Sequence, residues 1–261
     1  MPDATTDHIA RAFDLRHCFT TFTQRCGGAR VSSMIDHAHD LASVRDATDR
    51  LLTGVAKMDN ASVAEPSRLP GWSRGHVLAH LARNADALVN VLEGRPMYLS
   101  GEARDADIER DAPRALDAQL ADVRDSAARF QEAGAVPADW SRTVELRNGV
   151  TDSASRVPFR RWVEVELHHV DLGIGYELED LPEEFTEREI EFLADRFARH
   201  PDVPPTRLTD GTRAWRTGRE AQAPEVAVTG SPAGLLGWLA GRRDGTGLTV
   251  TGGPLPALPP L

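Results

Sequence analysis

The chain has 261 residues, of which 41% are hydrophobic and 27% are charged, a composition typical of a globular protein. Its net charge of −10 and its lack of Lys- and Arg-rich runs argue against a nucleic-acid partner. Because the sequence has neither a secretory signal nor an apolar run of roughly 20 residues, we expect a cytoplasmic protein that does not bind membranes.

Residues 1–33 show no sustained periodicity and are predicted to be a poorly ordered leader, with Met34 as an alternative start. Both cysteines of the chain, Cys18 and Cys26, lie in this leader, and their spacing matches no zinc or redox motif. Any thiol chemistry carried out by the rest of the chain would therefore need an external thiol.

A helical bundle is predicted for residues 34–178, because apolar residues recur there every three or four positions. The predicted helices cover about 34–58, 74–93, 114–131 and 158–173. Ser73 is the expected N-cap of the second helix, and Pro158 suits the first turn of the fourth. A short strand is predicted at 143–147, before an Asn-Gly turn.

The pattern changes over residues 179–261. A helix at about 186–199 is predicted to begin at the N-cap Thr186, and a second helix, at about 231–242, follows the N-cap Ser231. Strand-like runs lie at 213–216, 225–229 and 248–251. Helices mixed with strands predict a small α+β domain.

Two runs about eighty residues apart carry the best clue to function. The run 69–81 places His76 and His80 one helical turn apart, and the run 161–171 places Glu164 and His168 one turn apart. Side chains at positions i and i+4 project from the same face of a helix. Two histidines and one carboxylate leave a coordination position of a metal open, which is typical of catalytic metal sites.

Helix geometry selects His80, Glu164 and His168 as candidate ligands, and nitrogen and oxygen donors suit Zn²⁺ or another first-row metal. Glu166 lies about 200° from Glu164 on the helical wheel, and His169 lies about 100° from His168, so both are weaker candidates. Asp171 shares the face of Glu164 and His168 and is a candidate acceptor that orients a histidine.

Each run also has an ordinary explanation. A histidine pair on a helix is more often structural or solvent-facing than metal-binding, and a Glu–His pair at i and i+4 is commonly a surface pair. The metal interpretation rests on the occurrence of both runs on helices of one predicted bundle.

The residues of these runs resemble a known family. Leu-Pro-Gly-Trp-Ser-Arg-Gly-His-Val-Leu-Ala-His at 69–80 resembles the N-terminal signature of mycothiol-dependent maleylpyruvate isomerases, and Arg-Trp-Val-Glu-Val-Glu-Leu-His-His-Val-Asp at 161–171 resembles their second metal motif. Gly-Trp-Leu-Ala-Gly-Arg-Arg-Asp-Gly at 237–245 is similar to the end of their C-terminal domain. The resemblance covers about 34–261 and does not specify a substrate.

The resemblance implies an α+β protein, with a DinB-like four-helix metal-binding bundle followed by a small α/β domain similar to sterol carrier proteins. By motif position, the zinc ligands of the family fall on His80, Glu164 and His168. A C-terminal arginine that contributes to activity falls on Arg242, although the adjacent Arg243 matches almost as well. His76 and Asp86 are further candidates for supporting the site or binding the thiol.

The implied function is addition of an external thiol, mycothiol, to an electrophilic small molecule with the help of a divalent metal. The reaction would be the cis–trans isomerisation of maleylpyruvate or a mycothiol S-transfer. A metal-dependent hydrolase and a non-catalytic metal- or small-molecule-binding protein are the alternatives. The expected assembly is a monomer or a homodimer.

Overall fold

The computed structural model describes residues 35–136, 138–198, 200–218 and 226–260, so the predicted leader at 1–33 lies outside the described residues. The described chain forms two compact units, one that ends at Tyr176 and one that begins at Glu177. Among the described helices, none is long and apolar enough to cross a membrane.

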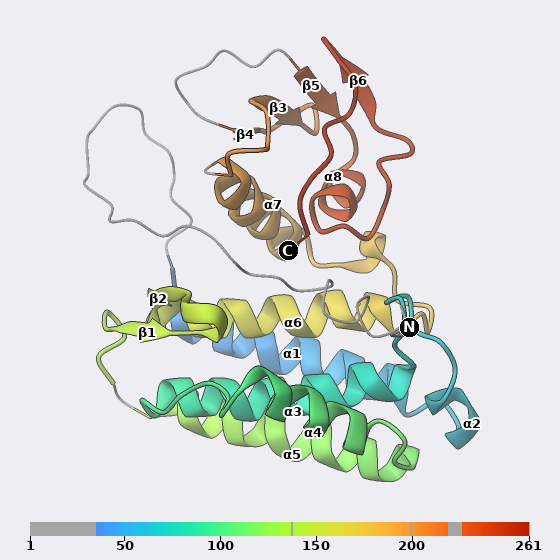
Figure 1. Ribbon diagram of the computed structural model, residues 1–261, viewed down its shortest axis with the longest axis vertical. Coiled ribbons are helices and arrows are strands. Elements are labelled where there is room, and N and C mark those ends of the chain that lie inside the picture. Colours follow the sequence, from blue (N-terminus) through green and yellow to red (C-terminus); the bar gives the residue numbers. More distant parts are fainter. Residues whose placement is uncertain (1–34, 137, 199, 219–225, 261) are drawn as a thin grey trace, which may run out of the picture. The chain divides into compact units, whose positions relative to one another are not determined.

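The first unit is a four-helix bundle with two additional short helices. Its helices are α1 (His37–Val55), α2 (Asn60–Val63), α3 (Arg74–Leu92), α4 (Gly101–Asp111), α5 (Leu116–Ala135) and α6 (Val157–Asp171). α3 packs beside α5, α5 beside α1, α1 beside α6, and α6 beside α3, which closes the bundle (Figure 1). The four predicted helices are confirmed, whereas α2 and α4 were not predicted.

Side chains cap the N-terminal ends of α1 and α3, and only the cap of α3 was predicted. Asp36 accepts hydrogen bonds from the backbone of Ala38 and His39 at the start of α1. Ser73 accepts one from the backbone of His76 at the start of α3, which confirms the predicted N-cap. These caps fix where α1 and α3 begin, and hence which residues face the core.

A hairpin joins α5 to α6. Strand β1 (Thr143–Glu145) pairs antiparallel with β2 (Thr151–Ser153), and the turn between them, η2 (Arg147–Gly149), places Asn148 at a φ of 60°. Asn is one of the few residues other than Gly that tolerate this left-handed conformation. The predicted strand at 143–147 is therefore confirmed, although it is shorter than expected. The short turn η3 (Ala154–Arg156) leads into α6.

The second unit combines two helices with a four-stranded sheet. Its elements are η4 (Leu178–Asp180), α7 (Glu183–Ala198), β3 (Thr206–Thr209), β4 (Ala214–Thr217), β5 (Val226–Thr229), α8 (Pro232–Leu239) and β6 (Thr249–Thr251). The strand order is β4-β3-β5-β6, with β3 and β5 parallel and the other pairs antiparallel. The expected small α+β arrangement is confirmed.

Two predictions for the second unit need correction. Thr186 is a buried residue inside α7 rather than its N-cap, because the helix begins at Glu183, where acidic side chains favour the first turn. Strand β3 was not predicted, since its four residues are two threonines that flank Arg207 and Leu208 and include a single apolar side chain. Ser231 does cap α8 as predicted.

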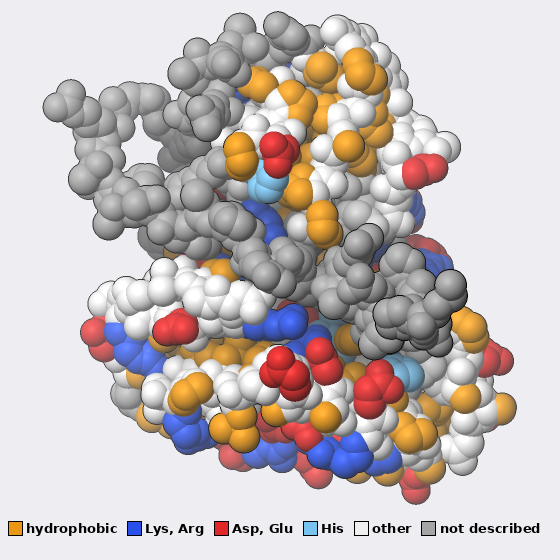
Figure 2. All heavy atoms as spheres, viewed as in Figure 1, with side chains coloured by type: hydrophobic (Ala, Val, Ile, Leu, Met, Phe, Trp, Pro, Cys, Tyr) orange, Lys and Arg blue, Asp and Glu red, His pale blue; other side chains and the backbone are white. Residues whose placement is uncertain are grey.

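The surface of the bundle carries charges of both signs. On the face drawn in Figure 2, basic and acidic side chains are interspersed over the helical unit. The ion pairs of this unit include Arg110 with Asp107 and Arg129 with Asp86, whose side chains are largely exposed. Such exposed pairs contribute little stability individually, so the core and the buried polar groups hold the bundle together.

Candidate metal centre

The facing sides of α3 and α6 bring three side chains to one point. His80 Nε2 lies 2.9 Å from Glu164 Oε2, and His168 Nε2 lies 3.2 Å from the same oxygen. One donor atom from each residue lies within 4.8 Å of the other two. The three residues that helix geometry selected are therefore close enough to hold one metal ion.

Burial differs among the three residues. His80 is 4% exposed and His168 is 1% exposed, so both imidazoles are held inside the bundle. The side chain of Glu164 keeps 27% of its surface exposed. Solvent therefore reaches the cluster on the Glu164 side.

The electrostatics of the cluster favour an ionised carboxylate beside imidazole nitrogens. Burial lowers the pKa of His80 to about 4, so this ring is neutral at pH 7. Burial alone would raise the pKa of Glu164, but hydrogen bonds from His168 and His80 outweigh it and hold the pKa well below its usual range. The carboxylate thus carries a full negative charge at neutral pH.

Asp171 orients the His168 ring. Its Oδ2 lies 2.9 Å from His168 Nδ1, and its side chain is fully buried. Burial opposes protonation of His168, yet the hydrogen bonds to Asp171 and Glu164 raise its pKa overall. A carboxylate on the far nitrogen is the usual partner of a metal-binding histidine, because it presents the other nitrogen to the ion.

Arg104 lies against the far nitrogen of His80 and was missed in the sequence. Its Nη2 is 3.2 Å from His80 Nδ1, and its Nη1 donates to Asp105 Oδ1 at 2.6 Å. Arg104 belongs to α4 and is only 7% exposed. Since α4 itself was not predicted, no sequence pattern connected this arginine with the two motif runs.

A buried Arg–Asn pair lies on the same two helices. Arg161, three residues before Glu164, donates from Nη1 to Asn84 Oδ1 at 2.7 Å, and Asn84 follows His80 by one turn. Burial lowers the pKa of Arg161 to about 10, while attraction to Glu164 works in the opposite direction. Arg161 therefore remains charged at pH 7 and supports the negative charge of Glu164.

The other candidate residues of the two runs lie elsewhere. His76 completes the cap of α3 through Ser73, and its Nε2 lies 3.4 Å from Glu109. The ring of His169 stacks on Tyr176 at a centroid distance of 4.0 Å.

Two carboxylates among the candidates are engaged in other ion pairs. Glu166 points to Arg50, and Asp86 pairs with Arg83 and Arg129.

Arg242 and Arg243 both follow α8 in the second unit. Arg242 donates to the backbone oxygen of Ala240 at 2.8 Å. Arg243 forms a two-pronged contact with Glu179, with distances of 2.7 and 2.8 Å. The forked contact places Arg243 in an ion pair within its own unit.

The residues at the centre fit a divalent metal. Two imidazole nitrogens and one carboxylate oxygen converge, and the far nitrogen of one imidazole is held by a buried carboxylate. Nitrogen and oxygen donors of this kind suit Zn²⁺ and other first-row metals, and three protein ligands leave room for an exchangeable one.

Comparisons with known proteins agree with this geometry. Residues 44–173 match the family model described as the mycothiol maleylpyruvate isomerase N-terminal domain, and residues 180–260 match the C-terminal domain model of that family. The crystal structure of the mycothiol-dependent maleylpyruvate isomerase is 30% identical, with a TM-score of 0.77, and the match covers 87% of this chain and 96% of that chain. The chain belongs to the mycothiol-dependent maleylpyruvate isomerase family.

Membership of the mycothiol-dependent maleylpyruvate isomerase family confirms the resemblance seen in the motifs and the expected fold. A histidine-to-alanine variant of the same isomerase matches at 29% identity, again with a TM-score of 0.77 and the same coverage. A search of curated proteins gave no significant match. The first family match ends at residue 173 and the second begins at residue 180, and the boundary between the two compact units, at Tyr176 and Glu177, lies between them.

Proposed function

We propose that this protein is a mycothiol-dependent enzyme that uses a divalent metal, zinc, to promote addition of the thiol to an electrophilic small molecule. The convergence of His80, Glu164 and His168 carries this proposal. Mycothiol dependence is supported by the names of the solved relatives. The site lies within residues 34–178, which we propose as the metal-binding domain, and residues 179–261 form the proposed second domain.

His80, Glu164 and His168 are the proposed metal ligands. A bound divalent ion is a Lewis acid that favours the thiolate form of a thiol at neutral pH, where a free thiol with a pKa near 8.5 is mostly protonated. Glu164 contributes the negative charge, and Asp171 fixes the ring of His168. The burial of both imidazoles keeps water away from all but the Glu164 side of the cluster.

The proposed reaction with maleylpyruvate is an isomerisation. The thiolate adds to one carbon of the cis double bond, and the other carbon takes up a proton. Rotation about the resulting single bond, followed by loss of a proton from that carbon and of the thiolate from its neighbour, gives the trans product and returns the thiol. We propose that the planar fork of Arg242 binds a carboxylate of the substrate.

The same first step serves an S-transferase, in which the thiol adduct is released. The two activities are distinguished by the fate of the thiol, because an isomerase returns it and a transferase consumes it. The test measures maleylpyruvate isomerisation and loss of free thiol, each with and without mycothiol, and repeats the thiol measurement with a bimane electrophile. Bound metal without any thiol-dependent turnover would overturn the proposal.

The proposed ligand set has a matched control on the same helix. We expect Glu164→Gln to remove or strongly weaken zinc binding, because it deletes the only negative charge among the proposed ligands. Glu166→Gln makes the same chemical change two residues away, where the side chain faces Arg50, and should leave the zinc content unchanged. Equal loss of zinc in both variants would contradict the assignment of the ligands.

A further inference from the structure

The two histidines of the centre have opposite partners on their far nitrogens. His168 Nδ1 faces a carboxylate oxygen of Asp171, an acceptor, whereas His80 Nδ1 faces the guanidinium of Arg104. An arginine side chain has five N–H donors and no acceptor. The contact at His80 is therefore a hydrogen bond only if Nδ1 carries no proton.

This contact fixes the tautomer of His80 for as long as it is made. With Nδ1 accepting from Arg104, the proton of the neutral ring must reside on Nε2. That proton points to Glu164 Oε2, which lies 2.9 Å from Nε2 and accepts it. Arg104, His80 and Glu164 thus form a chain of hydrogen bonds, all donated in one direction.

Metal binding requires the opposite tautomer. A neutral imidazole that gives its Nε2 lone pair to a metal carries its proton on Nδ1. A protonated Nδ1 and the N–H groups of Arg104 would be two donors facing each other at 3.2 Å. The contact between Arg104 and His80 and a metal on Nε2 are therefore incompatible for a neutral ring.

We propose that Arg104 is a positioning residue that holds His80 in the metal-free tautomer and leaves Nδ1 when the metal binds. The inference rests on the proposed role of His80 as a ligand. Arg104 retains partners when it moves, because Asp105 already accepts from its Nη1 and Tyr98 lies close enough to hydrogen-bond to it. The metal affinity of this site is thereby weakened by the free energy of one hydrogen bond to a charged group.

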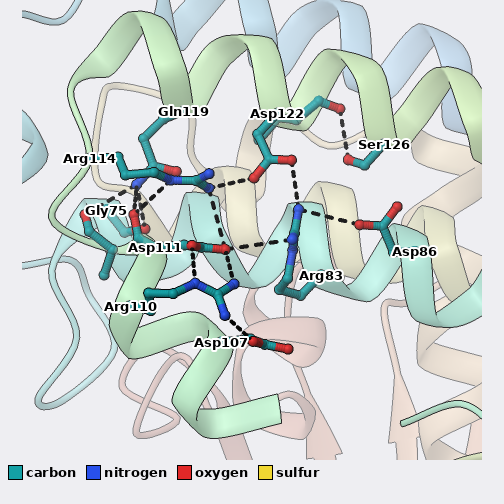
Figure 3. A network of polar contacts seen from close by, with 12 residues as sticks. Gly75, Arg83, Asp86, Asp107, Arg110, Asp111, Arg114, Gln119, Asp122 and Ser126 are labelled. Carbon is teal, nitrogen blue, oxygen red and sulfur yellow. Dashed lines mark hydrogen bonds and ion pairs between the residues drawn. The ribbon is translucent and has the colours of Figure 1, made fainter. Parts of the chain in front are cut away.

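The backbone position of Arg104 is set by contacts at the far end of α4. Arg104 shares one face of the helix with Ile108 and Asp111, at i, i+4 and i+7, and all three are buried. Figure 3 shows Asp111 at the centre of a network in which Arg83 joins it to Asp122. This network ties α4 to α3 and α5, so the bundle holds the backbone of Arg104 beside His80 and leaves the side chain to change partners.

The first test reads the tautomer directly by NMR of the ¹⁵N-labelled histidine rings. We expect His80 Nδ1 to be unprotonated in the metal-free protein and protonated after zinc is added. His168, with Asp171 on Nδ1, should keep a protonated Nδ1 in both states and is the internal control. A protonated His80 Nδ1 in the metal-free protein, or no change on zinc binding, would overturn the proposal.

The second test compares zinc affinities by competition with a chromogenic chelator. Arg104→Gln and Arg104→Met both remove the positive charge, but only glutamine offers an oxygen that accepts from a protonated Nδ1. We expect Arg104→Gln to bind zinc about tenfold more tightly than the wild type and more tightly than Arg104→Met. Equal affinities of the two variants would mean that charge alone matters, which contradicts the proposal.

Control variants separate the possible failures. Arg45→Gln removes one positive charge from an exposed position on α1 and should leave the affinity unchanged. If the wild type binds no zinc, the proposed metal site fails and the role of Arg104 fails with it. If zinc binds and depends on Glu164, but the His80 tautomer and the Arg104 variants do not respond, only the role of Arg104 is wrong.

Discussion

At the scale of single residues, the centre depends on side chains that hold its ligands. Asp171 is fully buried and accepts from His168 Nδ1, which turns Nε2 toward Glu164. An asparagine at this position can present an amide N–H instead of an acceptor. We therefore expect Asp171→Asn to weaken zinc binding by about 10- to 100-fold, the usual effect of losing such a partner.

The Asp171→Asn prediction is checked by chelator competition on the purified protein. Asp46→Asn makes the same isosteric change at an exposed position on α1 and should leave the affinity unaltered. An Asp171→Asn protein that binds zinc as tightly as the wild type would show that His168 is oriented by packing alone.

Replacement of Glu166 should lower the stability of the protein without changing its zinc binding. This fully buried carboxylate accepts hydrogen bonds from Trp162 Nε1 at 3.1 Å and Tyr176 Oη at 2.9 Å, and it pairs with Arg50. Because Arg50 is partly exposed, we expect Glu166→Gln to lower the free energy of unfolding by about 1–2 kcal/mol. Urea denaturation measures this loss, and an unchanged midpoint would contradict it.

Residue-level prediction from the sequence was strongest where spacing alone determines geometry. The i, i+4 spacing of Glu164 and His168 and the i+3 step to Asp171 place these side chains on one face, as the structure shows. The contact between His80 and Arg104 could not be predicted, since it depends on how a separate helix packs across the bundle.

At the scale of helices, the end of α4 packs closely against α3 at Gly75. A Cβ on Gly75 would lie 2.1 Å from the backbone oxygen of Ala112, the residue that follows α4, and 2.9 Å from a side-chain carbon of Val63. Neither neighbour is the end of a flexible side chain. We expect Gly75→Ala to destabilise the protein by about 1–3 kcal/mol, because α3 and the end of α4 would be forced apart.

Gly101→Ala is the matched control for the Gly75 prediction. Gly101 lies at the first position of α4 with no neighbouring atom within 4 Å of an added Cβ, so alanine should be neutral or slightly stabilising. Thermal unfolding of the two variants side by side measures the difference. Equal stabilities of the two variants would show that α3 and the end of α4 can accommodate a Cβ at position 75 without loss of stability.

The sequence did not reveal α4 because its buried face is mostly charged. Two of its three buried residues are Arg104 and Asp111, so the helix lacks the apolar periodicity by which the other bundle helices were recognised. α3, in contrast, buries an apolar stripe that includes Val77, Leu81 and Leu88, together with a strong N-cap, and its bounds followed from the sequence.

At the scale of the whole molecule, the proposed ligands all belong to the unit that ends at Tyr176. Zinc should therefore stabilise α3 and α6 selectively, since a ligand stabilises the folded form of the part that it binds, by about 2.7 kcal/mol at 100 times the dissociation constant. Hydrogen exchange with and without zinc measures this. Equal protection of strands β3–β6 would contradict a site built from the bundle alone.

The fold class of the whole chain followed from the change of pattern after residue 178. Apolar residues that recur every three or four positions predicted the bundle, and short strand-like runs mixed with helices predicted the second unit. The pairing of β3 with β5 could not be predicted from the sequence, because sheet order depends on contacts between segments that no local pattern specifies.

The loop before α3 is joined to the end of α6 by hydrogen bonds. Arg68 donates its backbone N–H to the oxygen of Asp171, and Arg74 Nε donates to that of Leu172, so the segment before α3 is fastened to the end of α6. One residue inserted between Arg74 and His80 would rotate the histidine by about 100° around the axis of α3, while the hydrogen bonds to the end of α6 would remain. A one-residue insertion should therefore be tolerated in a connection between bundle helices but should displace His80 from the site when it lies between Arg74 and His80.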